Sequence, residues 1–468
     1  MLAIAFVLVL FTDGTGAAFR HFIAPPAEES TIEYYEWAAA QPMALPRASP
    51  AVVVLPDGDI MVLGGLAATG PTASTEIFDV TSGSWVSGPS MTYKRVGHTA
   101  TLLMDGTVLV TGGDSAMGTT ATAELLDLTA GASIQLPSMS FARSAHAAIL
   151  LSNGNVLVTG GTDWVSGTWY QAEMYDAAQH KWLPAGSMAK ARVSFTLQML
   201  SDGSVLAIGG DSSATSEKYS PGSNSWSGLA SMTSKRYSSS SIKLDSGRIF
   251  VAGGTIDGTP TKSSETYDPP TNQWTRADDM AVQRASFSLA GLSNGLVMAA
   301  GSYSSLGTTS SVEVYSASNN TWWSAPSMAR SRGAHGFAVA ESGRAVYVIG
   351  GWSGTALTAT VERFSMVSVS VPDYCEPIDL VPLVLLATEL PGHSVNGFIA
   401  KLYAAQGEFD TGDIATCLNI MNGFYNALRG FTQSGHMTVE HSNVIYAGYV
   451  SVVTCLGGTP QPSIETNP

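Results

Sequence analysis

Aspartate and aromatic residues recur in the segments that follow a series of glycine pairs along the chain. The residues of these segments that could bind a ligand are Asp114, Asp163, Trp164, Trp169, Tyr170, Asp211, Asp257, Tyr303 and Trp352. An aromatic ring beside a carboxylate suits a sugar, which offers an apolar face and polar edges, and it also suits a protein partner. The sequence therefore predicts a binding surface for a protein or a glycan. Alternatively, the rings of Trp164, Trp169 and Trp352 fold back onto the strands of their own repeat.

Seven arginines each lie four residues after a methionine, and each repeat also carries one glutamate. The arginines are Arg47, Arg95, Arg143, Arg192, Arg236, Arg284 and Arg332, and the glutamates are Glu76, Glu124, Glu173, Glu217, Glu265, Glu313 and Glu362. We interpret them as buried, hydrogen-bonded ion pairs. In the alternative, the arginines present donors to an anionic ligand near the axis of the fold.

Three histidines, His98, His146 and His335, each follow a repeat arginine by three residues. We expect them on three neighbouring repeats (seven, one and two), where they could form a three-histidine metal site. We expect no metal there, because the side chains of the innermost strands should point between repeats. The sequence carries no paired acid–base signature, nucleophile motif or phosphate loop, so we expect no catalytic residue and no cofactor.

These residues belong to a unit that recurs about every 48 residues. Its anchors are Gly64-Gly65, Gly112-Gly113, Gly160-Gly161, Gly209-Gly210, Gly253-Gly254, Ala300-Gly301 and Gly350-Gly351. Apolar, β-branched strands are separated by turn dipeptides such as Asp57-Gly58. A fourth strand carries a tryptophan six residues before the next methionine, at Trp85, Trp182, Trp226, Trp274 and Trp322, and Ile134 or Leu136 takes its place in the second unit. Four short antiparallel strands per unit are typical of a propeller blade.

The Gly-Gly, Glu-x-Tyr-Asp, Trp and Met-x-x-x-Arg spacing resembles the kelch repeat over about 330 residues. The resemblance implies an all-β, seven-bladed kelch β-propeller, which we place within residues 33–371. One fourth strand is missing from the count, and Trp37 lies six residues before Met43 in the same register. We therefore expect Glu36–Gln41 to pair with Glu362–Phe364 and close the last blade, because closure removes exposed sheet edges. A strand over Met366–Val371 is the alternative.

Some kelch propellers are enzymes, and the galactose oxidase-like copper radical oxidases are the relevant comparison. They depend on a Cys–Tyr crosslink inside the propeller, and no cysteine lies between Trp37 and Phe364, which disfavours that chemistry here. We therefore favour a non-catalytic binding module. The alternative is an extracellular carbohydrate-active enzyme, either oxidase-like or a kelch-type sialic acid epimerase, and a structural scaffold is the third interpretation.

Beyond Val371 the pattern changes to helical spacing, which predicts a small all-α domain over residues 372–458 and a disordered tail over 459–468. The runs Ser394–Leu402, Gly412–Phe424 and Val452–Cys455 resemble the FIMAH domain, a helical module of secreted microbial proteins. All three cysteines lie in this part. Cys417 and Cys455 could form a disulfide, which would leave Cys375 unpaired or bound to another chain, and other pairings stay open.

The chain begins with an apolar run, Met1–Phe11, that predicts a secretory signal over residues 1–18, followed by a linker over 19–32. A short membrane anchor is the alternative. No later stretch is long and apolar enough to span a membrane. The net charge of −15 disfavours nucleic acid or an anionic membrane as a partner. We therefore expect a secreted, extracellular monomer.

Overall fold

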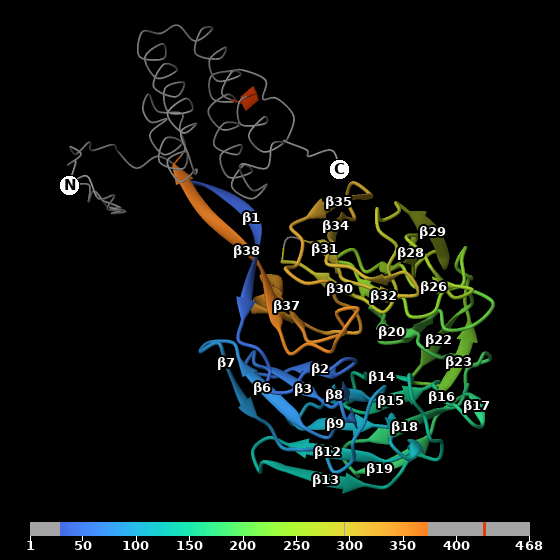
Figure 1. The fold of residues 1–468 in the computed structure, drawn as a ribbon. Helices are drawn as coiled ribbons and strands as arrows, with labels where there is room; N and C mark the ends of the chain where they lie inside the picture. Colours follow the sequence, from blue (N-terminus) through green and yellow to red (C-terminus); the bar gives the residue numbers. More distant parts are fainter. Residues whose placement is uncertain (1–28, 294, 373–424, 427–468) are drawn as a thin grey trace, which may run out of the picture. The chain divides into compact units, whose positions relative to one another are not determined.

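The computed structural model describes residues 29–293, 295–372 and 425–426, which include a ring of seven four-stranded antiparallel sheets (Figure 1). The predicted signal segment, the tail and the three cysteines lie outside the described residues. So does the predicted helical domain, except for Pro372, which ends a strand, and Tyr425 and Asn426, which are helical. Within the described ranges, no helix has the length and hydropathy of a membrane span.

Each sheet is one blade, numbered in chain order. From the inner edge outward the strands are β2 (Ala51–Val54), β3 (Ile60–Leu63), β6 (Thr75–Asp79) and β7 (Ser84–Ser87) in blade 1; β8 (Thr99–Leu102), β9 (Val108–Thr111), β12 (Ala123–Asp127) and β13 (Ala132–Leu136) in blade 2; β14 (Ala147–Leu150), β15 (Val156–Thr159), β18 (Ala172–Asp176) and β19 (Lys181–Pro184) in blade 3; and β20 (Thr196–Met199), β21 (Val205–Ile208), β22 (Ser216–Ser220) and β23 (Ser225–Gly228) in blade 4. They continue with β24 (Ser240–Lys243), β25 (Ile249–Ala252), β28 (Ser264–Asp268) and β29 (Gln273–Ala277) in blade 5; β30 (Ser288–Gly291), β31 (Leu296–Ala300), β34 (Val312–Ser316) and β35 (Thr321–Ala325) in blade 6; and β36 (Gly336–Ala340), β37 (Ala345–Ile349), β38 (Val361–Pro372) and β1 (Glu29–Ala40) in blade 7. A 3-10 helix, η1 (Glu341–Gly343), joins β36 to β37.

The first strands of neighbouring blades lie side by side around the whole ring, and β36 of blade 7 contacts β2 of blade 1. Blade 7 is completed by the N-terminal strand β1, which pairs with β38. The segment Met366–Val371 continues β38 and does not form a separate outer strand. Residues Glu29–Ile32, which we expected to be linker, begin β1. The residues Trp37–Ser365 form one compact unit.

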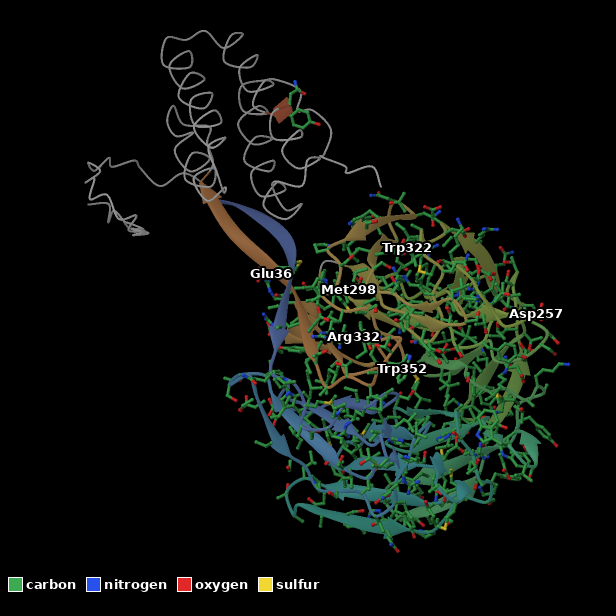
Figure 2. All side chains as sticks on the ribbon, in the orientation of Figure 1. Glu36, Asp257, Met298, Trp322, Arg332 and Trp352 are labelled. Atoms are coloured by element: carbon green, nitrogen blue, oxygen red, sulfur yellow. The ribbon has the colours of Figure 1, made fainter. Side chains whose placement is uncertain are left out.

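The second strand of each blade lies in the interior, as its apolar, β-branched composition predicts. In β31, for example, Met298 has no exposed surface (Figure 2). Further out in the blade, an aromatic residue of the third strand faces the tryptophan of the fourth strand. In blade 4, for example, Tyr219 and Trp226 are directly paired, with ring centroids 5.3 Å apart. Every blade except blade 2 carries such a pair, and in blade 7 it is Phe364 with Trp37. These rings supply the apolar contact between the outer strands.

The outer-strand tryptophans also link each blade to the one before it. The indole N–H of Trp226 in blade 4 donates to the carbonyl of Gly186, which follows the outer strand of blade 3, at 2.8 Å. Trp37 makes the same contact from blade 7 to Pro326 at 2.7 Å. In blade 2 the tryptophan position is held by Ser133, which faces Leu126, and not by Ile134 or Leu136 as we expected, so the junction of blade 2 with blade 1 does not have this bond. The tryptophans therefore act at the junctions as well as within their sheets.

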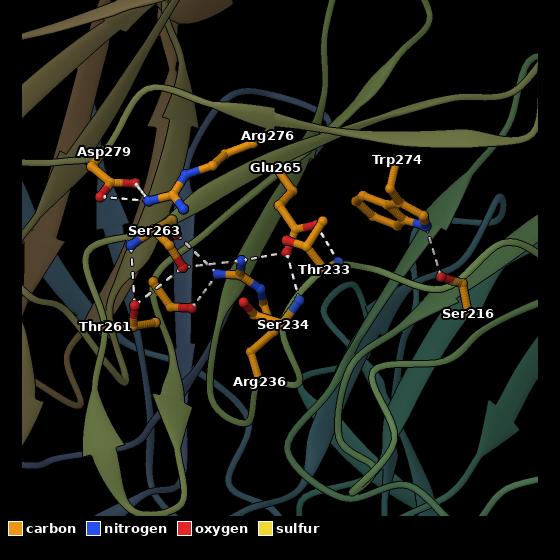
Figure 3. A network of polar contacts seen from close by, with 11 residues as sticks. Ser216, Thr233, Ser234, Arg236, Thr261, Ser263, Glu265, Trp274, Arg276 and Asp279 are labelled. Carbon is orange, nitrogen blue, oxygen red and sulfur yellow. Dashed lines mark hydrogen bonds and ion pairs between the residues drawn. The ribbon is translucent and has the colours of Figure 1, made fainter.

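A buried arginine occupies every blade junction. The main chain of Arg236 bonds to blade 4, where its carbonyl accepts from Gly210 N at 2.9 Å. Its side chain reaches blade 5, where it donates to the carbonyls of Gly253 at 2.8 Å and Ser263 at 2.9 Å and to Glu265 at 2.7 Å (Figure 3). All seven repeat arginines pair with the glutamate of their blade in this way.

These arginines have no exposed surface, and the glutamates are at most 6% exposed. Each glutamate also accepts a main-chain N–H from the segment that enters its blade, as Glu265 does from Thr233 at 2.6 Å. The ion-pair interpretation is therefore confirmed. The alternative, in which the arginines offer donors to an anionic ligand, is wrong because every guanidinium lies inside the protein and most of its donors are already bonded.

We expect Arg332→Ala to lower the free energy of unfolding by about 3–5 kcal/mol, because it leaves the buried Glu362 without its positive partner. The exposed Arg330, two residues away, is a matched control, and Arg330→Ala should change stability by no more than about 0.5 kcal/mol. Urea denaturation of both variants measures the difference. Equal effects of the two substitutions would show that the buried ion pair does not stabilise the ring.

Candidate binding surface

One face of the propeller, termed here the hairpin face, is built from the loops between the second and third strands and from the segments that join the blades. These parts are paired with one another, since Val96 bridges to Asp114 and Ser144 bridges to Thr162. In five blades the loop is a two-stranded hairpin: β4 (Leu66–Ala67) with β5 (Gly70–Pro71), β10 (Asp114–Ser115) with β11 (Gly118–Thr119), β16 (Thr162–Asp163) with β17 (Gly167–Thr168), β26 (Thr255–Ile256) with β27 (Thr259–Pro260), and β32 (Tyr303–Ser304) with β33 (Gly307–Thr308). Most of the predicted binding residues lie on this face.

Asp114 and Trp164 are in direct contact across the junction of blades 2 and 3. Asp114 Oδ1 accepts from Thr119 Oγ1 at 2.7 Å. Its Oδ2 accepts from Ser144 Oγ at 2.7 Å and from the indole N–H of Trp164 at 3.0 Å. Trp164 nevertheless remains 67% exposed. Because its polar edge is bonded to the neighbouring blade while its ring faces solvent, Trp164 presents an oriented apolar surface instead of folding back onto its own blade.

Four further candidates lie on the hairpins of this face or beside them. Asp163 caps the turn of its own hairpin, with its carboxylate accepting from Val165 N at 3.2 Å and Ser166 Oγ at 2.8 Å. Asp257 is at the tip of the blade 5 hairpin (Figure 2), where its exposed carboxylate pairs with Lys235 Nζ at 2.6 Å. The rings of Tyr170 and Tyr303 are 48% and 46% exposed. These side chains are accessible to a partner.

Trp169 and Trp352 are half-buried. The indole N–H of Trp169 donates to the carbonyl of Ala142 at 2.8 Å, and its ring packs on Phe141 with centroids 5.1 Å apart. Both contacts belong to the segment that enters blade 3. The main chain of Trp352 pairs with Gly333 and Leu357. For Trp169 the alternative of packing onto its own blade therefore describes the structure better than a free binding surface.

Asp211 lies inside blade 4 and not on the surface where we expected it. Blade 4 has a short loop in place of a hairpin, and this loop turns the carboxylate inward, where it is 4% exposed. It accepts from Thr215 Oγ1 and lies 3.7 Å from Arg192 Nη1. Asp211 is thus a third member of the buried Arg192–Glu217 pair and cannot contact a partner molecule.

The large hydrophobic side chains that are exposed to solvent are concentrated on the hairpin face. Of the twelve that are exposed in the described residues, eight lie there: Leu66, Tyr93, Met117, Trp164, Val165, Tyr170, Tyr303 and Leu306. Met117 and Val165, at the tips of the blade 2 and blade 3 hairpins, are 96% and 95% exposed. Met117, Val165 and Leu306 are not among the residues that we predicted to bind a partner. These exposed tips could have been identified from the sequence, because each has an apolar residue one or two positions before the hairpin glycine, as in Met117-Gly118 and Leu306-Gly307.

The three histidines lie at the starts of the inner strands of blades 2, 3 and 7, so they are not on three neighbouring blades as we expected. Each ring packs against the glycine pair of the preceding blade, and a Cβ on Gly64 would lie 2.7 Å from His98 Cε1. Phe195 and Phe287 hold the same position in blades 4 and 6, which indicates a packing role. In the part of the chain that the structure describes, no group of three His, Cys, Asp or Glu side chains is placed to hold a metal.

Comparison with known proteins agrees with this architecture. The kelch motif model matches residues 47–92, 245–281 and 333–368. The repeats are kelch repeats. A solved structure of a fungal alcohol oxidase of the AA5 family, in complex with copper, is similar with a TM-score of 0.61 and 17% identity, over 73% of this chain and 77% of that chain. At this identity the likeness shows the shared propeller fold alone. No curated protein sequence matches.

The buried histidines make the kelch propeller sensitive to acid. Burial, together with the charges of Arg332 and Arg284, lowers the pKa of His335 to about 3. Burial and the charge of Arg95 likewise lower the pKa of His98 to about 3. In the unfolded chain each imidazole would take up a proton near pH 6.5. The unfolded state therefore binds more protons between about pH 6.5 and 3, and stability is lost as the pH falls through that window.

We expect His335→Phe to reduce the loss of stability between pH 7 and pH 5 by about 2 kcal/mol, because it removes one group that only the unfolded state protonates there. The reciprocal change, Phe287→His, should steepen the same dependence. Urea denaturation at the two pH values measures both slopes. Unchanged slopes in the two variants would show that these positions do not control acid stability.

Proposed function

We propose that this kelch propeller is a secreted, non-catalytic binding module that uses its hairpin face to bind an extracellular protein or glycan. The observation that carries the proposal is the cluster of Met117, Trp164 and Val165 on the neighbouring hairpins of blades 2 and 3. These side chains are at least 67% exposed and contribute little apolar burial to the free protein. Exposed, oriented aromatic and methionine side chains are typical of the centre of a binding interface.

The two ligand classes use different parts of this cluster. A sugar ring would stack on the exposed ring of Trp164, whose indole N–H is already taken by Asp114. A protein would in addition cover the aliphatic tips Met117 and Val165, which give a sugar no stacking surface. The presence of these two tips favours a protein partner. Secretion rests on the N-terminal sequence, and it stays a prediction.

The alternative function, an extracellular carbohydrate-active enzyme, rests on the fold likeness to the alcohol oxidase. A scaffold is the third interpretation, and the inward packing of Trp169 is what favours it. The exposure of Trp164, Tyr170 and Tyr303 favours binding instead, because a scaffold gains nothing from rings held in solvent.

The test is a glycan array together with a pull-down from culture medium, using wild type and the double variant Met117→Ser/Trp164→Ala. We expect the variant to lose the detected interaction, by about a hundredfold in affinity if the two residues are the main anchors of the interface. Loss in the array identifies a glycan, and loss in the pull-down alone identifies a protein.

The matched control is Met104→Ser/Trp323→Ala, which removes a methionine and a tryptophan that are 69% and 39% exposed away from the hairpin face. This variant should bind as wild type does. If the Met117/Trp164 variant keeps every interaction, or if both variants lose binding equally, the hairpin face is not the binding surface.

A further inference from the structure

A cavity of about 220 Å³ lies where blade 5 meets blade 6, at the end of the blades away from the hairpin face. It is lined by the turn before β25, by the outer strands β28 and β29, and by the turn between β34 and β35. Leu244, Ala277 and the ring of Tyr315 give it buried apolar walls. Arg248, Arg276 and Asn320 supply its nitrogen donors, and Thr266 and Thr275 add two hydroxyl groups. No carboxylate is among the residues that line it.

The turn that carries Arg248 lacks an aspartate that blades 1, 2 and 4 have at the matching position, and blade 7 shares its Ser-Gly-Arg sequence as Ser342-Gly343-Arg344. In blades 2 and 4 the matching residue is a short hydroxyl residue that bonds to an aspartate of its own turn, as Thr107 does to Asp105 at 2.7 Å. In blade 5 the turn carries Ser246 in place of the aspartate. The guanidinium of Arg248 has no hydrogen bond or ion pair with any described residue, although its main-chain N–H reaches Ser246 Oγ at 3.5 Å.

The other two nitrogen-donor residues, Arg276 and Asn320, are held in place by their neighbours but keep free donors. Arg276 uses only Nη2 for its ion pair with Asp279, at 3.0 Å to both oxygens (Figure 3), so Nε and Nη1 remain unbonded among the described residues. Asn320 Oδ1 accepts from the Tyr315 hydroxyl at 2.9 Å and from Asp278 N at 3.0 Å, which leaves its Nδ2 as a donor. The charge of Arg248 also acts on Tyr315: burial raises the pKa of this phenol, the charge of Arg248 and a hydrogen bond with Thr266 oppose that shift, and the charge of Asp278 adds to it.

We propose that this cavity binds the oxyanion group of a small molecule, such as a sugar acid or a sulfated sugar. Guanidinium groups bind planar carboxylates and tetrahedral oxyanions through paired N–H donors. Asp279 pairs with Arg276, whereas Arg248 forms an ion pair with none of the described carboxylates and is the cation available to an anion. The volume admits about one sugar ring, whose apolar face would lie against Leu244, Ala277 and Tyr315. This site is separate from the hairpin face and does not depend on the function proposed for it.

Isothermal titration of the full chain at constant ionic strength tests the proposal, with glucuronate, inorganic sulfate and inorganic phosphate as probes and uncharged glucose as the comparison. Wild type should bind at least one of the anions and bind glucose much more weakly. Tighter binding of glucuronate than of sulfate or phosphate would identify a sugar acid, and the reverse order would identify a sulfate or phosphate group as the ligand.

Arg248→Gln and Arg276→Gln should each weaken anion binding by about tenfold or more, because each removes charge-assisted donors. Arg330→Gln removes an exposed arginine elsewhere and should leave binding unchanged. The proposal is overturned if wild type binds none of the anions saturably, if Arg248→Gln binds as wild type does, or if Arg330→Gln weakens binding as much as Arg248→Gln. An affinity for glucose equal to that for the tightest-binding anion would overturn it as well.

Discussion

The buried arginine–glutamate pair at each blade junction is the interaction on which the propeller depends. The arginine main chain belongs to the edge of one blade, while its side chain ends inside the next, so the same residue fixes the distance and the register between two sheets. Burying two charges is costly, and here the cost is offset by carbonyl and main-chain N–H partners around both groups. A blade shifted from its place would leave a charge unpaired in the interior. We infer that the ion pairs specify the ring geometry as much as they stabilise it.

Because these junctions hold the strands, the loops after the glycine pairs can differ in length and composition. Blades 2 and 3 extend theirs into hairpins that carry Met117 and Trp164 outward. Blade 4 shortens the same loop, and Asp211 then joins the buried pair of Arg192. The same segment of the repeat therefore serves either the surface or the interior, and its length decides which. This explains why any specific function of a kelch propeller is to be sought in its loops.

Much of the architecture could be predicted from the sequence, because it depends on residue types that recur at fixed spacing. Charged arginine and glutamate at otherwise apolar strand ends indicate buried pairs, and Trp37 in register with the other tryptophans indicates how the ring closes. The candidate site was less predictable. Trp164 and Trp169 are five residues apart in one loop, yet only Trp164 stays exposed, because Ala142 and Phe141 on a preceding segment cover Trp169. Contacts between segments distant in sequence decide such cases, and the repeat pattern does not contain them.

The cavity between blades 5 and 6 also arises from variation in a turn between otherwise similar blades. It requires no new motif, only Ser246 and Arg248 at turn positions where blades 1, 2 and 4 have an aspartate and a short polar residue. The cavity is separate from the cluster of Met117, Trp164 and Val165 on the hairpin face, so binding at one site could affect the other only through the blades between them. Coupling between sites requires an element with two alternative arrangements that both ligands influence. Every junction between blade 2 and blade 6 contains a buried ion pair that a shifted blade would break, so we infer that an anion in the cavity and a partner on the hairpin face bind independently.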